Sequence, residues 1–146
     1  MHADAFETPE AAALDGFPDA HCRAVATRVS GDDAYVLLDT GEPGYPYLYG
    51  AVLVRENGAW REVASSNGPG WTSTCEDDEL GTRVDWDVAP EGVDQVLVSF
   101  RGETRVEPVT NGVYIATWWR VPSTLAAPRV EAFRIQGRWV PTGNGR

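Results

Sequence analysis

The residues of this sequence that could do chemistry are mainly carboxylates, because histidine and cysteine are scarce. The chain has two histidines, His2 and His21, and two cysteines, Cys22 and Cys75. A nucleophilic triad needs a base that a third group holds in place, and His21 has only Cys22 beside it in the sequence. The four residues also lack the C-x-x-C and H-x-x-x-H spacings typical of zinc sites. The sequence therefore predicts no metal, no cofactor and no nucleophilic catalysis.

Asp85 and Asp87 form the carboxylate pair best spaced for acid–base or glycosidic chemistry. On a strand they point to one face, and the alternating Val84, Trp86 and Val88 point to the other. Such chemistry requires environments that separate the two pKa values, which the sequence does not show. We therefore expect a solvated outer strand face that carries the two aspartates, with the three apolar side chains turned toward the core.

Four consecutive acids follow Cys75 at the end of a long polar loop, residues 67–79. They are Glu76, Asp77, Asp78 and Glu79. The D-x-D-x-D-G spacing of a calcium loop is missing, whereas a loop of this length is often functional. Two interpretations stay open, a solvated loop and a contact surface for a basic partner.

Aromatic side chains are the most informative feature, because Trp, Tyr and Arg anchor interfaces and line ligand pockets. Between residues 114 and 121, strand alternation predicts two faces. One carries Tyr114, Trp118 and Arg120, and the other Ile115, Trp119 and Val121.

A second tyrosine series precedes the central hairpin, where Tyr45, Tyr47 and Tyr49 share one face of an extended strand. We name Tyr47, Tyr114, Trp118 and Arg120, together with the acids at 76–79, as candidate binding residues. A partner-binding surface requires a partly exposed Trp118. A closed ligand pocket and a second layer of core packing are the alternatives, and in the latter Trp118 is buried.

The elements that position these residues are organised around the stretch from Tyr45 to Ser65. Asn57-Gly58 separates two apolar, β-prone runs and favours a type I′ turn, and Trp60 supplies core surface. Thr8-Pro9-Glu10 predicts a helix start that ends near Asp15-Gly16. Further strands are predicted at 22–29, 34–39, 81–88, 93–101, 103–110, 113–121, 129–136 and 138–141, with turns at Arg101-Gly102, Asn111-Gly112 and Gln136-Gly137.

Together these elements predict a mainly antiparallel β domain, either a sandwich or a strongly curved sheet, with one short N-terminal helix. The 146 residues suit a single domain, 1–146. Within it, a helix plus meander at 8–66 and a second meander at 80–141 are joined by the 67–79 loop.

Composition narrows the function classes. Twelve arginines, no lysine and 22 acids give a net charge of −10, which opposes non-specific nucleic-acid binding and favours cationic partners. No stretch approaches the length of a membrane span, and the N-terminus reads as no signal peptide. We therefore expect a cytoplasmic protein. Two free thiols at Cys22 and Cys75 are the preferred interpretation, with a disulfide left open.

Two segments of the sequence resemble known groups of proteins. Residues 34–66, with a strand, a G-x-W hairpin and the N-G-P-G-W exit, resemble uncharacterised small acidic β-rich proteins of high-GC bacteria. The helix and curved meander at 8–66 are similar to nuclear-transport-factor-like domains, although the Asp/His pairs of such enzymes have no match and the C-terminal meander has too many strands. Neither resemblance implies a function, because fold does not determine one.

The function that the sequence favours is a non-catalytic, acidic, protein-binding module of the inhibitor or immunity type, with a protein partner that is basic. One alternative is a small-molecule pocket between sheet and helix with weak hydrolase or isomerase activity. The other is a homo-oligomer whose aromatic face is its subunit interface.

Overall fold

The computed structural model describes residues 6–66, 70–72, 80–122 and 127–142. One helix and eleven strands form this part of the chain. They are α1 (Pro9–Leu14), β1 (Arg23–Ser30), β2 (Asp33–Asp39), β3 (Leu48–Glu56), β4 (Ala59–Ser66), β5 (Gly70–Thr72), β6 (Leu80–Val88), β7 (Val93–Phe100), β8 (Glu103–Pro108), β9 (Val113–Pro122), β10 (Arg129–Ile135) and β11 (Arg138–Pro141).

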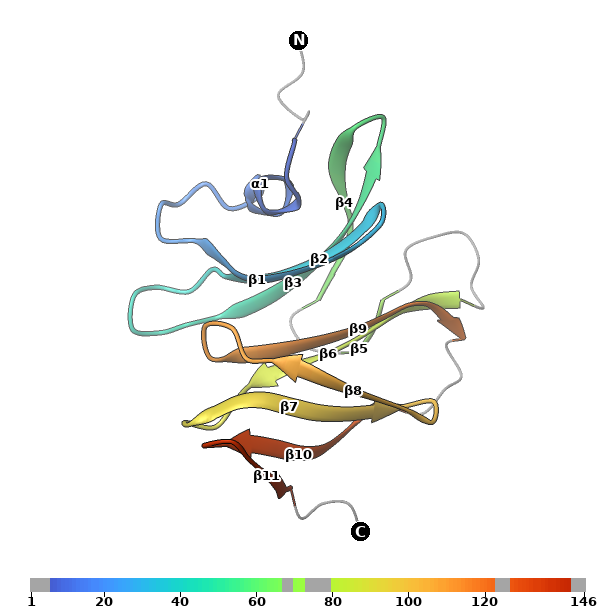
Figure 1. Cartoon of the computed structure of the whole chain (residues 1–146). Coiled ribbons are helices and arrows are strands. Elements are labelled where there is room, and N and C mark those ends of the chain that lie inside the picture. Colours follow the sequence, from blue (N-terminus) through green and yellow to red (C-terminus); the bar gives the residue numbers. More distant parts are fainter. Residues whose placement is uncertain (1–5, 67–69, 73–79, 123–126, 143–146) are drawn as a thin grey trace.

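The strands form three antiparallel sheets, stacked beneath the helix (Figure 1). Helix α1 covers the upper sheet, whose order is β1-β2-β3-β4; the middle sheet is β5-β6-β9, and the lower sheet is β11-β10-β7-β8. The predicted mainly antiparallel β fold with one short N-terminal helix is confirmed. The stack contains one more layer than a two-sheet sandwich, and this explains several side-chain positions that the sequence did not predict.

Helix α1 begins where its capping chemistry predicts. The Thr8 hydroxyl oxygen accepts a hydrogen bond from the Ala11 amide at 3.1 Å, and Pro9 occupies the first helical turn. Proline is favourable there because its missing N–H would have no partner within the helix. The short helix ends at Asp15, so it covers only part of the upper sheet.

The four predicted two-residue turns are all present, and each has two consecutive residues with positive φ. At the central turn, Asn57 has φ 55° and Gly58 has φ 81°. Such a pair gives a hairpin the twist of its strands and is the signature of a type I′ turn. The same pattern occurs at Arg101-Gly102, Asn111-Gly112 and Gln136-Gly137.

Three apolar clusters fill the spaces between the four layers. Between α1 and the upper sheet, Ala13, Leu53 and Trp60 are buried, which confirms Trp60 as a core residue. Between the upper and middle sheets, Tyr35 packs with Trp86 and Ile115. The third cluster joins the middle and lower sheets through Val96, Phe100, Tyr114 and Trp118, among others.

The middle sheet is covered on both faces, and this corrects the prediction for Asp85, whereas Asp87 is exposed as predicted. Val84 and Trp86 face the upper sheet as predicted. The opposite face does not form the solvated outside of the molecule, because the lower sheet packs against it, and Asp85 is half-buried. Val88 is exposed rather than part of the core.

Polar contacts join strand β1 of the upper sheet to β8 and to the turn between β8 and β9. The Asn111 side-chain amide donates to the Val25 carbonyl oxygen at 2.7 Å. Arg28 lies 3.9 Å from the Glu107 carboxylate, and burial raises the pKa of that carboxyl while the Arg28 charge lowers it.

Among the described residues, no helix has the length and apolar character needed to cross a membrane.

Candidate functional site

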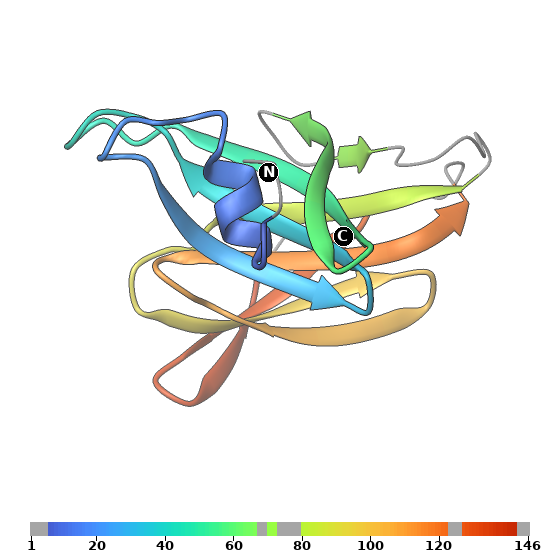
Figure 2. The same ribbon diagram turned by 90° about the horizontal axis from the view of Figure 1, so that it is seen from above.

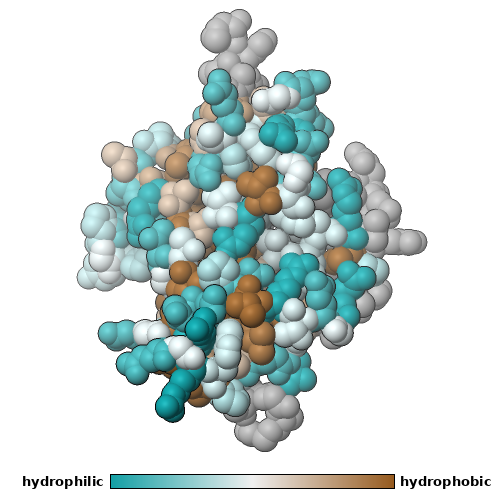
Figure 3. Space-filling view, viewed as in Figure 1, coloured by the Kyte–Doolittle hydropathy of each residue, from teal (hydrophilic) through white to brown (hydrophobic). Residues whose placement is uncertain are grey.

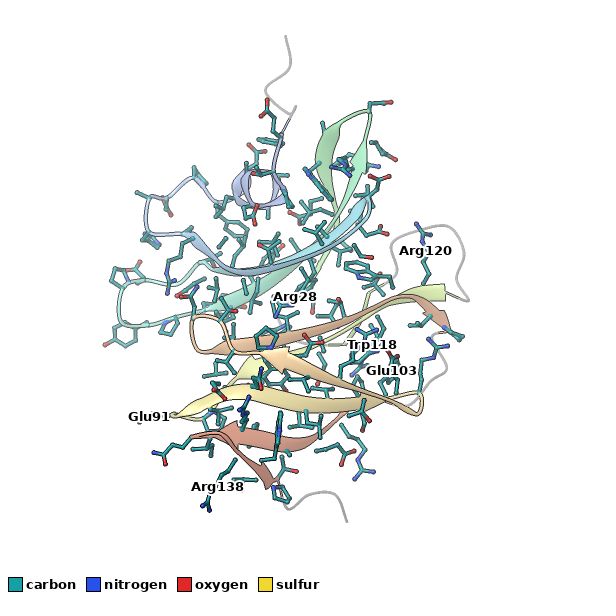
Figure 4. All side chains as sticks on the ribbon, viewed as in Figure 1. Arg28, Glu91, Glu103, Trp118, Arg120 and Arg138 are labelled. Carbon is teal, nitrogen blue, oxygen red and sulfur yellow. The ribbon has the colours of Figure 1, made fainter. Side chains whose placement is uncertain are left out.

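Trp118 lies in the core between the middle and lower sheets. Its side chain is 2% exposed, and its ring centroid is 4.7 Å from that of Phe100. The Arg105 guanidinium covers the Trp118 ring at 4.8 Å and donates to the Thr117 carbonyl oxygen at 2.6 Å. Figure 4 shows Trp118 enclosed between strands. The partly exposed Trp118 that a partner surface requires is therefore absent, and the structure corresponds to the core-packing alternative.

Arg120 does not lie on the strand face that Tyr114 and Trp118 share. A bulge lies between the pairs Gly81–Val121 and Arg83–Trp118, and Arg120 adopts φ 55° within it. An extra residue in one strand breaks the alternation of side chains. Val121 consequently packs beside Trp118 rather than beside Ile115 as predicted. Arg120 points away from the strands (Figure 4) and lies 3.8 Å from the Asp33 carboxylate.

Tyr47 lies outside the strand predicted to carry it. Strand β3 begins at Leu48, and Tyr47 belongs to the loop before it, where it is 51% exposed. The Asp39 carboxylate fixes this loop by accepting hydrogen bonds from the Gly41 and Tyr47 amides at 3.0 and 3.1 Å. Of the three tyrosines, Tyr49 alone packs beneath α1, in edge contact with Phe17.

The structure thus brings Tyr114 and Trp118 together inside the core and leaves Tyr47 and Arg120 at separate places on the surface. The acidic run at Glu76, Asp77, Asp78 and Glu79 lies outside the described residues. Its predicted role in contacting a basic partner stays a prediction.

A groove lies between α1 and the β3–β4 hairpin. Figure 2 looks down on these elements. The groove has a volume of about 740 Å³. Its apolar floor includes Phe6, Ala12 and Trp60, and its polar rim includes Asp15, Glu56 and Glu62. It is open to solvent rather than closed over.

The outer edge of β4 forms one side of this groove. Strand β4 is the last strand of the upper sheet, and the Trp60 amide donates to the Phe6 carbonyl oxygen at 2.9 Å. Phe6 and Trp60 form an isolated antiparallel bridge. From Arg61 to Ser65 no described strand pairs with this edge. The edge therefore already holds one extended residue, Phe6.

The rim of the groove carries three carboxylates and one guanidinium. The guanidinium of Arg61 is bound by Glu56 at 2.9 Å, so that pair is largely neutral. Asp15 and Glu62 remain, and both residues are exposed. Partial burial raises the pKa of the Glu62 carboxyl, and a nearby cation would favour its charged form. The two carboxylates therefore favour a positively charged group.

Sequence reasoning missed this groove because its parts are separated by some forty residues and lie on a helix and a hairpin. The N-G-x-W pattern indicated the hairpin and Trp60, but the contact with Phe6 is not encoded locally. On the face shown in Figure 3, hydrophobic side chains occur in small groups among hydrophilic ones.

The described residues contain no group of three or more His, Cys, Asp and Glu side chains that could hold a metal ion. His21 is exposed, and the neighbouring Cys22 is a free thiol. Comparisons with models of protein families, with curated proteins and with solved structures found no match to this chain.

Proposed function

We propose that this protein is a non-catalytic binding module that takes up an extended, basic polypeptide segment in the groove between α1 and β4. The segment adds to the upper sheet as a strand beside β4. The observation that carries the proposal is the hydrogen bond from the Trp60 amide to the Phe6 carbonyl, by which this edge already pairs with one extended residue of the chain itself.

A polypeptide suits this place better than a small molecule. An exposed strand edge offers main-chain donors and acceptors at regular intervals, and strand addition is a recurring mode of peptide recognition. The apolar floor at Phe6 and Trp60 can receive alternate side chains of the segment. A small ligand would satisfy few of the edge groups and would remain exposed in an open groove.

The charge of the segment follows from the charge of the protein. The whole chain carries a net charge of −10, and Asp15 and Glu62 lie on the rim of the groove. Such a field speeds the approach of cations and weakens as salt is added. The acidic run at 76–79 provides a second contact for the same partner. A basic protein neutralised by an inhibitor or immunity-type module fits these features.

The proposal places the protein in a reducing, cytoplasmic compartment. The free thiol of Cys22 supports this, because disulfides are rare there. The Cys22 sulfur lies 4.0 Å from the Thr40 carbonyl oxygen in a partly buried position.

The test is titration calorimetry with a peptide of alternating lysine and valine as long as β4, eight residues, and with its glutamate counterpart. The lysine peptide should bind, and added salt should weaken it. Glu62→Arg should weaken binding about fivefold, as expected for a rim charge. The matched control is Glu91→Arg, which makes the same charge change in the turn between β6 and β7, away from the groove (Figure 4).

Equal loss of affinity in both variants would show attraction by net charge alone, and the groove would lose its role. Equal binding of the lysine and glutamate peptides would refute the basic partner. The two alternatives from the sequence have their own signatures. A small-molecule pocket would show ligand stabilisation without peptide binding, and a homo-oligomer would show a concentration-dependent mass in sedimentation.

A further inference from the structure

A second cavity, of about 370 Å³, lies between the middle and lower sheets, at their edge. It is separate from the groove beneath α1, and none of its lining residues belongs to that groove. The polar side chains around it include Asp87, Tyr114 and Arg129, and the apolar ones are Val88, Val130 and Phe133.

The cavity exists because β6 extends beyond its neighbour. Strand β5 pairs only with residues 82–84 of β6, so the stretch that carries Asp85 and Asp87 has β9 on one side and no described strand on the other. Asp87 lies opposite Tyr114 in the register of β6 and β9. Both aspartates therefore lie on the Tyr114 face, at an open margin between two sheets.

Tyr114 is the most informative residue of this cavity. Its side chain is 5% exposed and lines the cavity. Burial raises the pKa of its hydroxyl, and the Asp85 and Asp87 charges add to this effect. Asp87 lies opposite Tyr114 on the neighbouring strand, and both side chains line the cavity.

One carboxylate, Asp87, and one guanidinium, Arg129, line the cavity. Arg129 is largely exposed and lies 4.0 Å from the Glu131 carboxylate, which offsets part of its charge. Burial raises the pKa of the nearby Asp85, whereas the Arg83 charge lowers it. The Asp87 carboxylate accepts a hydrogen bond from the Val88 amide at 2.7 Å through one oxygen, and its other oxygen can receive a further donor.

From this arrangement we infer that the cavity binds a small organic cation, a primary ammonium group joined to an apolar body. The ammonium donates to the Asp87 carboxylate and the Tyr114 hydroxyl, and the apolar body packs against Val130 and Phe133. An ammonium carries three donors and no acceptor, which matches the acceptor oxygens of Asp87 and Tyr114 in the lining. The inference is independent of the peptide groove, so either can fail alone.

The test compares three probes of one shape by titration calorimetry: phenethylammonium, 2-phenylethanol and 3-phenylpropionate. Phenethylammonium should bind about tenfold more tightly than the alcohol, because hydrogen bonds to charged groups are the stronger ones. The propionate should not bind. Asp87→Asn and Tyr114→Phe should each weaken phenethylammonium about fivefold or more. Glu91→Gln, an exposed acid outside the cavity, should leave its affinity unchanged.

Thermal unfolding of each variant shows that it is folded before binding is measured. Tyr114→Phe keeps the ring, so it tests the hydroxyl even if a larger change would unfold the protein. Equal affinity for the ammonium and the alcohol would overturn the inference. So would an ammonium affinity that neither substitution changes, or no binding up to about 10 mM probe.

Discussion

Gly50→Ala tests the packing between the upper and middle sheets. A Cβ atom at residue 50 would lie 1.7 Å from the Tyr35 hydroxyl oxygen and 2.4 Å from its ring carbon Cζ. Tyr35 is 1% exposed, so it has little room to move away. Overpacking of a core costs about 1–3 kcal/mol, and we expect the free energy of unfolding to fall by that amount.

The strain should come from contact rather than from backbone conformation, because Gly50 has no positive φ. Gly16→Ala is the matched control, since a Cβ atom there would meet nothing within 4 Å. It should be neutral or stabilising by up to about 1 kcal/mol, because alanine restricts the unfolded chain. In the double variant, Tyr35→Phe removes the closest atom and should recover part of the loss that Gly50→Ala causes.

Urea unfolding followed by tryptophan fluorescence measures each of these variants. If Gly50→Ala and Gly16→Ala unfold at the same urea concentration, the contact between Gly50 and Tyr35 is not as described. Full additivity of the two substitutions in the double variant would lead to the same conclusion.

Three further predictions concern the core, the turn and the pH dependence of stability. Trp118→Ala should lower the free energy of unfolding in urea by about 3–5 kcal/mol. Trp139→Ala removes a side chain that is 41% exposed and should lower it much less. Similar losses in the two variants would contradict the buried position of Trp118. Asn57-Gly58→Ala-Ala should cost about 1–2 kcal/mol, because alanine disfavours positive φ, and an unchanged unfolding midpoint would refute the type I′ turn. Burial raises the pKa of the Asp85 carboxyl above its ordinary 3.8. The folded state therefore holds the carboxyl proton more tightly than the unfolded state does. As a result, the contribution of Asp85 to stability falls as pH rises from about 3.8 through the raised pKa. Asp85→Asn should therefore reduce the loss of stability over that pH range, measured by thermal unfolding, and an unaltered pH profile would contradict the half-buried carboxyl.

Local chemistry made much of the fold predictable. The cap at Thr8 and the four two-residue turns depend on residues adjacent in sequence, and all were found where predicted. The alternation of Val84 and Trp86 also identified one buried face of β6 correctly. These features need no knowledge of which strands become neighbours.

Features that depend on distant contacts were not predictable in this way. In the sequence Asp85 looks as solvated as the exposed Asp87, because nothing local shows that the lower sheet packs against this face of β6. The bulge at Arg120 breaks the alternation that placed Val121 with Ile115. Positive φ at an arginine has no sequence signal comparable to that at asparagine or glycine.

In the candidate site too, only the features that depend on neighbouring residues were predictable. The aromatic residue types indicated an interface, but Trp118 lies in the core between two sheets. The open groove is lined instead by Phe6, Trp60 and the acids around them. Trp60 was recognised as part of the hairpin, but the free edge of β4 became visible only once the strand order was known.

Amide hydrogen exchange with the lysine–valine peptide bound tests the peptide groove most directly. If the peptide adds as a strand, the amides of β4 between Arg61 and Ser65 that face away from β3 gain protection, while those of β7 and β8 do not change. Binding that leaves the exchange rates of these β4 amides as they are in the free protein would contradict the proposed mode of recognition.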